Sequence, residues 1–183
     1  MAGLCEQLEN WNSFTADKRF HDTEQNLRDL ARRLGINDNF QIKREAPPHN
    51  PGHRAEWDGN TDTLYLDPDL FENHPGSTTD GFDYAYSSAS HELMHGLHDQ
   101  LDEEFDPDTD AEWETSKEER EQMAQAFAAA FLKAVKDQCK GKGKIGESPI
   151  QDVLNQFGAD ALEREVESSD PPLPSDWSLP EEE

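Results

Sequence analysis

Basic residues are scarce in this sequence: 16 lysines and arginines stand against 41 aspartates and glutamates, and the formal net charge is −25. A surface of this sign repels nucleic-acid phosphates and anionic lipid headgroups, so we expect no nucleic-acid partner and no membrane contact. Three explanations of the charge compete: a surface suited to high salt, a decoy that engages a basic protein, and disordered acidic ends. We favour the first, with a contribution from the third, because the acidic residues are spread along the whole chain.

Long apolar runs and a basic N-terminal segment are also missing. Apolar residues make up only 33% of the chain, and no stretch approaches the ~20 apolar residues of a membrane-spanning helix. The segment from Met1 to Glu6 has neither basic charge nor an apolar run, which predicts no signal peptide. Cysteine occurs only as Cys5 and Cys139, too few for a disulfide framework. We expect a cytoplasmic monomer, with leaderless export as the alternative.

The length of 183 residues is typical of one domain with a sizeable core. We place this domain at residues 1–160, and we expect the acidic, proline-rich stretch 161–183 to be mostly disordered because it has little to bury. Hydrophobic periodicity and turn residues predict the elements of the domain. These are a helix at 15–34, a strand at 40–44, a hairpin of strands 53–57 and 63–66, a helix that begins at Asp80 or Asp83, a helix at about 114–138 and a short helix at 149–157.

The stretch from His91 to His95 reads HELMH and matches the pattern H-E-x-x-H. On a helix, residues four apart lie on the same face, so both imidazoles can reach one tetrahedral zinc at ~2.0–2.1 Å. Glu92 would flank the open coordination position and accept a proton from zinc-bound water. The competing interpretation is a surface helix with two incidental histidines. Apolar residues at helical spacing argue against it, because they give this helix a core face: Phe82, Ala85, Ala89, Leu93, Leu97 and Leu101.

A catalytic zinc site needs a third protein ligand, and the same helix does not supply it. His98 lies ~10 Å along the axis from His91, too far for a shared metal in a straight helix. The extended metzincin pattern also fails, because Asp99 and Leu101 stand where it requires glycine and histidine. We therefore expect His98 to support the ligands or to be exposed.

The next predicted helix offers a glutamate in a suitable position. Glu121 extends an apolar stripe towards the N-terminus of this helix, and a carboxylate that faces a core needs a charge partner such as zinc. Glu118 and Glu114 remain alternatives, whereas Glu119 faces the opposite way. Glu121 could also be simply the last polar residue before the stripe begins. The stripe consists of Ala124, Ala128, Phe131, Leu132 and Val135.

These two motifs resemble the gluzincin branch of the zincin metallopeptidases, and most of all the compact ImmA/IrrE-type zinc peptidases. Residues 121–132 read EQMAQAFAAAFL, similar to that family's E-x-E-A-N-x-F-A-A-x-L-L, with Met123 for the second glutamate and Gln125 for the usual Asn or Asp. The resemblance covers roughly residues 53–135. It implies a small α+β zincin-like fold, with a short, mostly antiparallel sheet packed on the H-E-x-x-H helix and a second ligand-bearing helix. It also implies that strand 62–66 is the sheet edge that lines the substrate cleft.

The resulting prediction is a Zn²⁺-dependent endopeptidase that acts on a protein or peptide substrate. Zinc would be held by His91, His95 and Glu121, and Glu92 would activate water. Two alternatives remain: a catalytically silent zincin that serves as a binding module, and an acidic decoy in which the motif is incidental. The presence of Glu92 favours the enzyme, because a purely structural zinc site does not need it. Candidate substrate and oxyanion contacts are Leu64, Tyr65, His74, Tyr84 and Tyr86.

Overall fold

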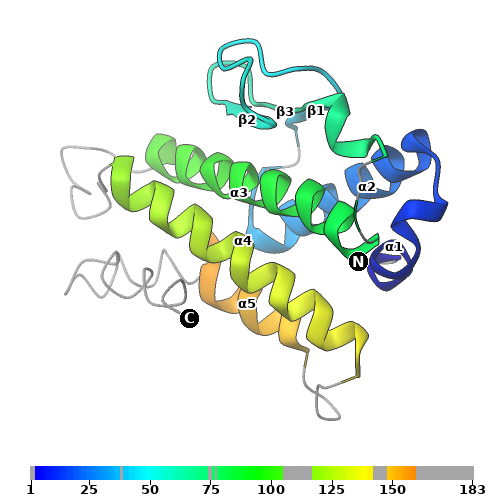
Figure 1. Cartoon of the computed structure of the whole chain (residues 1–183). Helices are drawn as coiled ribbons and strands as arrows, with labels where there is room; N and C mark the ends of the chain where they lie inside the picture. Colours follow the sequence, from blue (N-terminus) through cyan, green and yellow to red (C-terminus); the bar gives the residue numbers. More distant parts are fainter. Residues whose placement is uncertain are drawn as a thin grey trace.

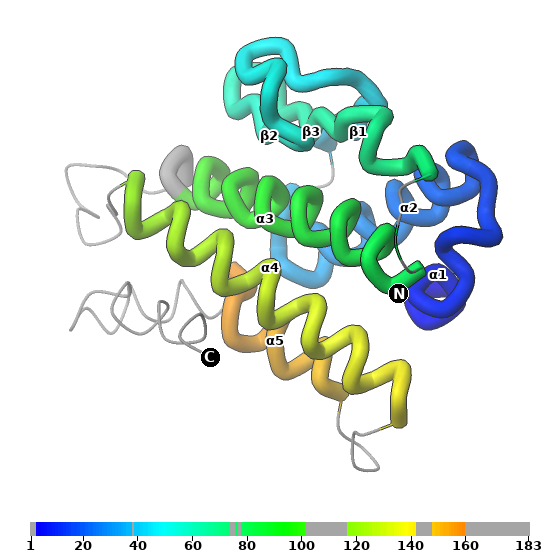
Figure 2. Tube along the Cα trace, in the orientation of Figure 1, coloured from blue at the N-terminus to red at the C-terminus, as the bar shows by residue number. Residues whose placement is uncertain are grey.

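The computed structural model describes residues 3–37, 39–73, 76, 78–104 (backbone only for 102–104), 117–141 and 148–159. In it, α3 runs through the middle, the sheet lies on one side of α3, α4 lies on another, and α5 packs against α4 (Figures 1 and 2). The chain is thus a mostly helical α+β fold. The elements are α1 (Leu4–Asn10), η1 (Trp11–Ser13), α2 (Ala16–Leu34), β1 (Gln41–Lys43), β2 (Ala55–Asp58), β3 (Thr63–Leu66), η2 (Pro68–Phe71), α3 (Thr78–Glu104), α4 (Lys117–Cys139) and α5 (Pro149–Phe157).

The three strands form a small mixed sheet in the order β1-β3-β2. The hairpin gives an antiparallel pair, with Trp57 opposite Leu64, whereas β1 pairs in parallel, with Ile42 opposite Leu64. Two expectations are therefore wrong. The sheet is not mostly antiparallel, and β3 is the central strand, because a strand paired on both sides cannot be an edge. The edges of the described sheet are β1 and β2.

Helices α2, α4 and α5 follow the prediction, α3 begins earlier than predicted, and α1 was not predicted. Helix α2 has the Thr15 hydroxyl as its N-cap acceptor and ends at Gly35, whose φ of 93° is a left-handed conformation that glycine adopts readily. Helix α3 begins at Thr78, so neither Asp80 nor Asp83 is its cap. Asp83 instead accepts from Lys136 Nζ at 2.7 Å and ties α3 to α4. The predicted core face of α3 is confirmed, since all its apolar residues are buried: Phe82, Ala85, Ala89, Leu93, Leu97 and Leu101.

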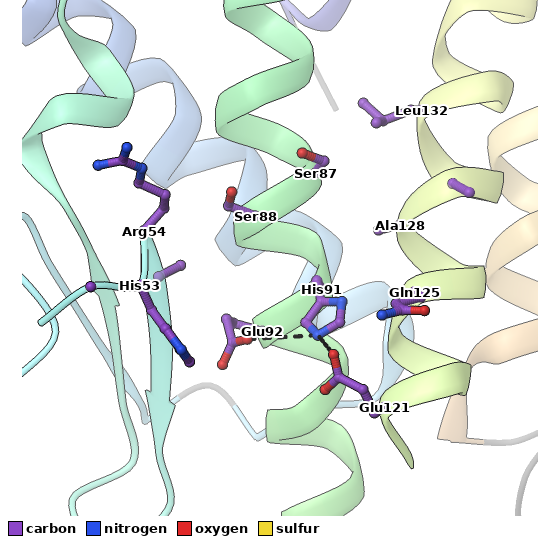
Figure 3. Close-up of a pocket in the computed structure, with 13 residues that line it drawn as sticks. His53, Arg54, Ser87, Ser88, His91, Glu92, Glu121, Gln125, Ala128 and Leu132 are labelled. Carbon is purple, nitrogen blue, oxygen red and sulfur yellow. Dashed lines mark ion pairs between the residues drawn. The ribbon is translucent and has the colours of Figure 1, made fainter. Parts of the chain in front are cut away.

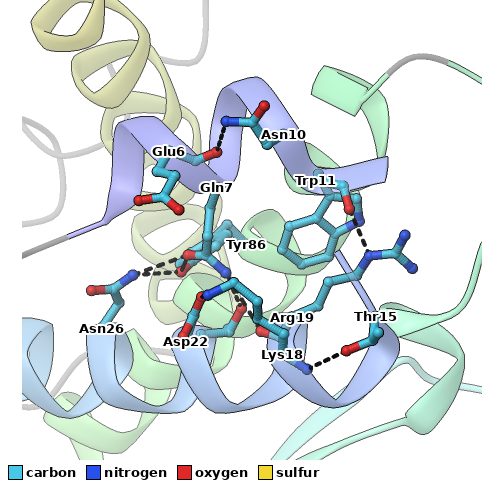
Figure 4. Close-up of polar contacts among 11 residues, drawn as sticks. Glu6, Gln7, Asn10, Trp11, Thr15, Lys18, Arg19, Asp22, Asn26 and Tyr86 are labelled. Carbon is cyan, nitrogen blue, oxygen red and sulfur yellow. Dashed lines mark hydrogen bonds and ion pairs between the residues drawn. The ribbon is translucent and has the colours of Figure 1, made fainter. Parts of the chain in front are cut away.

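The N-terminal helix α1 is held by buried polar contacts that the sequence did not predict (Figure 4). Gln7 Oε1 accepts from Asn26 Nδ2 at 3.0 Å and from the Tyr86 hydroxyl. Arg19 is buried, and its guanidinium donates to the carbonyl oxygens of Trp11 and Phe71, each at 2.8 Å. Because these buried groups are hydrogen-bonded, they fix α1 and α2 against α3 without leaving their polar atoms unsatisfied.

The two cysteines form a disulfide that joins α1 to the last residue of α4, Cys5 to Cys139, with 5.3 Å between the Cα atoms. Such bonds are rare in a reducing cytoplasm, so the expected cytoplasmic location loses support. Across the described ranges, every helix is too short or too polar to cross a membrane. The C-terminal stretch 161–183 lies outside the described residues.

Candidate metal centre

The H-E-x-x-H segment lies in the second half of α3, where one turn brings the two histidines together. Leu93, Met94 and Leu97 of the same segment are buried, so the core fixes the rotation of the helix about its axis. His91 and His95 therefore lie on the opposite face, and their Nε2 atoms are 3.2 Å apart. The spacing of four residues predicted this pairing.

Glu121 comes from α4, which runs antiparallel to α3. Two ion pairs show this direction. Lys136 contacts Asp83 at one end of the helix pair, and Arg120 contacts Asp99 at the other. Near the second end, Glu121 reaches both histidines. Its Oε2 is 3.0 Å from His91 Nε2, and its Oε1 is 3.0 Å from His95 Nε2. The structure thus brings together the three residues expected to bind zinc.

The distances between these donor atoms fit a zinc ion. Ligands at ~2.0–2.1 Å from tetrahedral zinc lie about 3.3–3.4 Å apart, close to the observed 3.0 and 3.2 Å. At these distances an Nε2–H of His95 can also donate to the His91 ring or to the Glu121 carboxylate, depending on the tautomer. When both Nε2 atoms are unprotonated, they direct lone pairs towards the same region as the carboxylate. The set of two neutral imidazoles and one carboxylate is also one that catalytic zinc sites use.

The electrostatics of the site favour the metal-binding form of two donors, His95 and Glu121. Burial lowers the pKa of His95, and the neighbouring His91 lowers it further. Burial alone would raise the pKa of Glu121, but His91 and His95 outweigh it and hold that pKa below its ordinary value. A deprotonated imidazole and an ionised carboxylate are both required for metal binding.

Glu92 lies beside these ligands but is held differently. Its Oε1 accepts the backbone N–H of Trp57 at 2.9 Å, and its Oε2 is 3.8 Å from His91 Nε2. Burial raises the pKa of Glu92 to about 7, and the carboxylates of Glu121, Glu56 and Asp99 add to the rise against the opposing Trp57 hydrogen bond. A carboxylate with this pKa can accept and release a proton near neutral pH.

A cavity of about 680 Å³ opens beside His91, Glu92 and Glu121 (Figure 3). Its walls come from the segment leading into β2, from α3 and from α4, so it lies where the sheet and the two helices meet. The lining residues are Gly52, His53, Arg54, Ala55, Ser87, Ser88, His91, Glu92, Glu121, Gln125, Ala128, Ala129 and Leu132.

The residues predicted for substrate contact lie elsewhere. Leu64 is fully buried in the central strand, and Tyr86 is buried with its hydroxyl engaged by Gln7 and Asn26. The structure gives these two assignments no support, because both side chains are buried outside the cavity and Leu64 is paired on both sides in the sheet. Tyr65 and Tyr84 are partly buried and are not among the lining residues. His74 lies outside the described residues.

The structure also describes two of the alternative metal ligands, His98 and Glu118. His98 is buried rather than exposed, and burial, followed by the charges of His95 and Arg120, lowers its pKa to about 3. It therefore stays neutral at physiological pH. Glu118 is exposed at the start of α4, and Glu114 lies outside the described residues.

His53 and Arg54 are among the polar cavity residues that were missed as site candidates. They appeared in the sequence only as the start of a predicted strand. Their position directly before a strand that leads towards the H-E-x-x-H helix was the only available signal. No protein-family model matches the chain, and neither curated proteins nor solved structures give a match.

Proposed function

We propose that this protein is a zinc-dependent endopeptidase of the gluzincin type. The observation that carries the proposal is the triangle of His91 Nε2, His95 Nε2 and the Glu121 carboxylate, with sides of 3.0 to 3.2 Å. These three residues would hold the ion. Glu92 beside the triangle adds a proton acceptor that a structural zinc site does not need, and this favours an enzyme over a binding module.

Zinc, when bound, supplies a Lewis acid that polarises a carbonyl group and lowers the pKa of water. Glu92 contributes the proton transfer. Its Oε1 is fixed by the Trp57 amide, which leaves Oε2 to take a proton from the attacking water and then pass it to the departing amine. Its raised pKa suits both steps, because the same group must first accept a proton and then donate it.

The edge of β2 that pairs with no described strand would bind the substrate backbone. Arg54 O accepts from Asp67 N at 2.9 Å, whereas Trp57 N turns away from β3 and donates to Glu92. Since strand residues alternate in direction, the N–H and C=O of Ala55 point to the open edge. Ala55 also lines the cavity. An extended peptide can therefore add to β2, in place of the strand 62–66 expected earlier.

The proposed substrate is a protein or peptide rather than a nucleic acid, in keeping with the net charge of −25. The cytoplasmic location remains a proposal, and the Cys5–Cys139 disulfide weighs against it. A compartment in which disulfides persist fits this covalent link between α1 and α4 better than a reducing cytoplasm does.

Metal analysis followed by digestion of a peptide library tests the function. We expect one zinc per chain in the parent, and none after the double change His91→Ala and His95→Ala. Glu92→Gln should keep fold and zinc yet abolish cleavage, because the near-isosteric amide cannot accept the proton. Stoichiometric zinc in the double variant would rule out the site, and activity of Glu92→Gln within tenfold of the parent would assign the base elsewhere.

A further inference from the structure

We propose that His53 is a further catalytic residue, one that donates a hydrogen bond to the substrate carbonyl oxygen as negative charge develops there. This inference rests on the proposed peptidase function. It replaces the earlier oxyanion candidate Tyr86, which is buried away from the cavity. The evidence is the position of His53 in the cavity and the engagement of most other possible donors around it.

Most polar side chains of the cavity already have partners. The Ser87 and Ser88 hydroxyls donate to the Tyr84 carbonyl oxygen at 3.4 and 3.1 Å. Arg54 forms an ion pair with Asp69 at 3.3 Å, and its guanidinium carbon lies 5.6 Å from the centre of the Tyr84 ring. These contacts hold the three side chains away from the metal ligands.

His53 differs from them in both contacts and direction. Its backbone N–H donates to Asn50 O at 2.9 Å, which fixes the turn before β2. Within the described residues, no hydrogen bond or ion pair involves its imidazole. Figure 3 shows the ring pointing from the strand towards the side of Glu92, whereas Arg54 points away from it. The imidazole N–H is thus available to a molecule in the cavity.

The placement suits oxyanion stabilisation. A peptide added to β2 at Ala55 would pass directly beside His53, two residues earlier in the chain, before it reaches the ligands on α3. Gln125 also lines the cavity, but it comes from the opposite wall on α4, one turn after Glu121. His53 therefore donates from the strand side, where a polarised carbonyl oxygen is otherwise open to solvent. Loss of one such donor lowers kcat by about 10²–10³-fold in other enzymes.

A test that needs no known substrate uses acetohydroxamate, whose carbonyl oxygen mimics the reacting one at a zinc site. Its affinity for the zinc-loaded protein is measured by calorimetry for the parent and for His53→Ala, His53→Gln and His21→Ala. We expect about tenfold weaker binding for His53→Ala, partial recovery for His53→Gln through its amide N–H, and no change for His21→Ala. His21 is exposed on α2 and distant from the cavity lining. Zinc content and Tm should be the same in all four proteins.

A peptide cleaved in the library digest gives the second measurement. We expect kcat to fall about 100-fold in His53→Ala with KM within about threefold, because the hydrogen bond strengthens in the transition state. The inference is overturned if His53→Ala binds acetohydroxamate within twofold of the parent, or cleaves within threefold while Glu92→Gln is inactive. If the parent holds no zinc, or if Glu92→Gln remains active, the proposed function itself fails, and the inference falls with it.

Discussion

At the scale of single residues, Glu121 is the part of the candidate site that depends most on tertiary packing. His91 and His95 are four residues apart on one helix and would lie together in any protein that forms it. Glu121 must come from a second helix, and its side chain is 49% exposed. It is therefore held less by burial than by its contacts with the two imidazoles. A cation bound between these groups would hold this exposed carboxylate in place.

Zinc affinity should depend on Glu121. In Glu121→Ala only two histidines remain as ligands, so we expect affinity to fall well beyond the ~10–100-fold typical of groups that merely support ligands. Chelator competition on the purified variants measures the loss.

Glu118→Ala is the matched control, since Glu118 is exposed three residues earlier on the same helix and should cost little. If Glu118→Ala instead removes the metal, Glu118 and not Glu121 is the third ligand. If neither change matters while His98→Ala removes it, the gluzincin proposal fails.

At the scale of elements, the contact between β2 and α3 positions Glu92, the proposed general base. The Trp57 amide holds Glu92, and the Trp57 ring packs over Gly96, one turn further along α3. A Cβ at Gly96 would lie 2.9 Å from ring atoms of Trp57. Glycine inside this helix thus allows the strand to approach closely, which a helix-propensity scale would count only as a cost.

Gly96→Ala should lower the stability of the protein. Alanine favours the helix by about 1 kcal/mol, but crowding a packed aromatic ring costs about 1–3 kcal/mol. A shift of Trp57 would also weaken the amide hydrogen bond to Glu92, so we expect a lower Tm and reduced peptide cleavage with zinc content unchanged. Thermal unfolding, a peptide-cleavage assay and metal analysis check these three outcomes, and a higher Tm would show that Trp57 moves without strain.

At the scale of the whole molecule, the disulfide links distant parts of the chain, since Cys5 and Cys139 are 134 residues apart. Closing so long a loop restricts the unfolded chain, and we expect the double change Cys5→Ser and Cys139→Ser to cost about 2–5 kcal/mol. Zinc affinity at 25 °C should stay within about threefold, because Cys139 lies about five turns from Glu121 along α4. Chemical unfolding with and without reductant measures the loss. An unchanged midpoint would mean that the bond contributes nothing in solution.

Salt should stabilise the protein as a whole. With a net charge of −25, self-repulsion destabilises the compact state, and molar KCl screens it. Screening also weakens exposed ion pairs such as Lys18–Asp22, but these are worth little. We expect Tm to rise with KCl and to rise less with sorbitol at equal osmolality. A steady fall in Tm, together with tight binding of a basic protein at low salt, would support the decoy alternative.

Local patterns determined much of this protein. The i, i+4 histidines, the buried stripe of α3, the end of α2 at Leu34 and the span of α5 all follow from contacts within a few residues, so the sequence alone predicted them. Glu121 was chosen as a ligand because it extends the apolar stripe of its own helix. Only the packing of α4 on α3 brings its carboxylate close to the histidines.

The tertiary structure alone decided what depends on distant segments. The pairing of β3 on both sides made β2 the edge, the fold brought Cys5 to Cys139, and the burial of Tyr86 removed it from the site. The entry of His53 into the cavity has the same origin. Hydrophobic periodicity records which face of an element is buried, but not which other element covers it. Contacts between elements far apart in the chain are therefore set by how their surfaces pack.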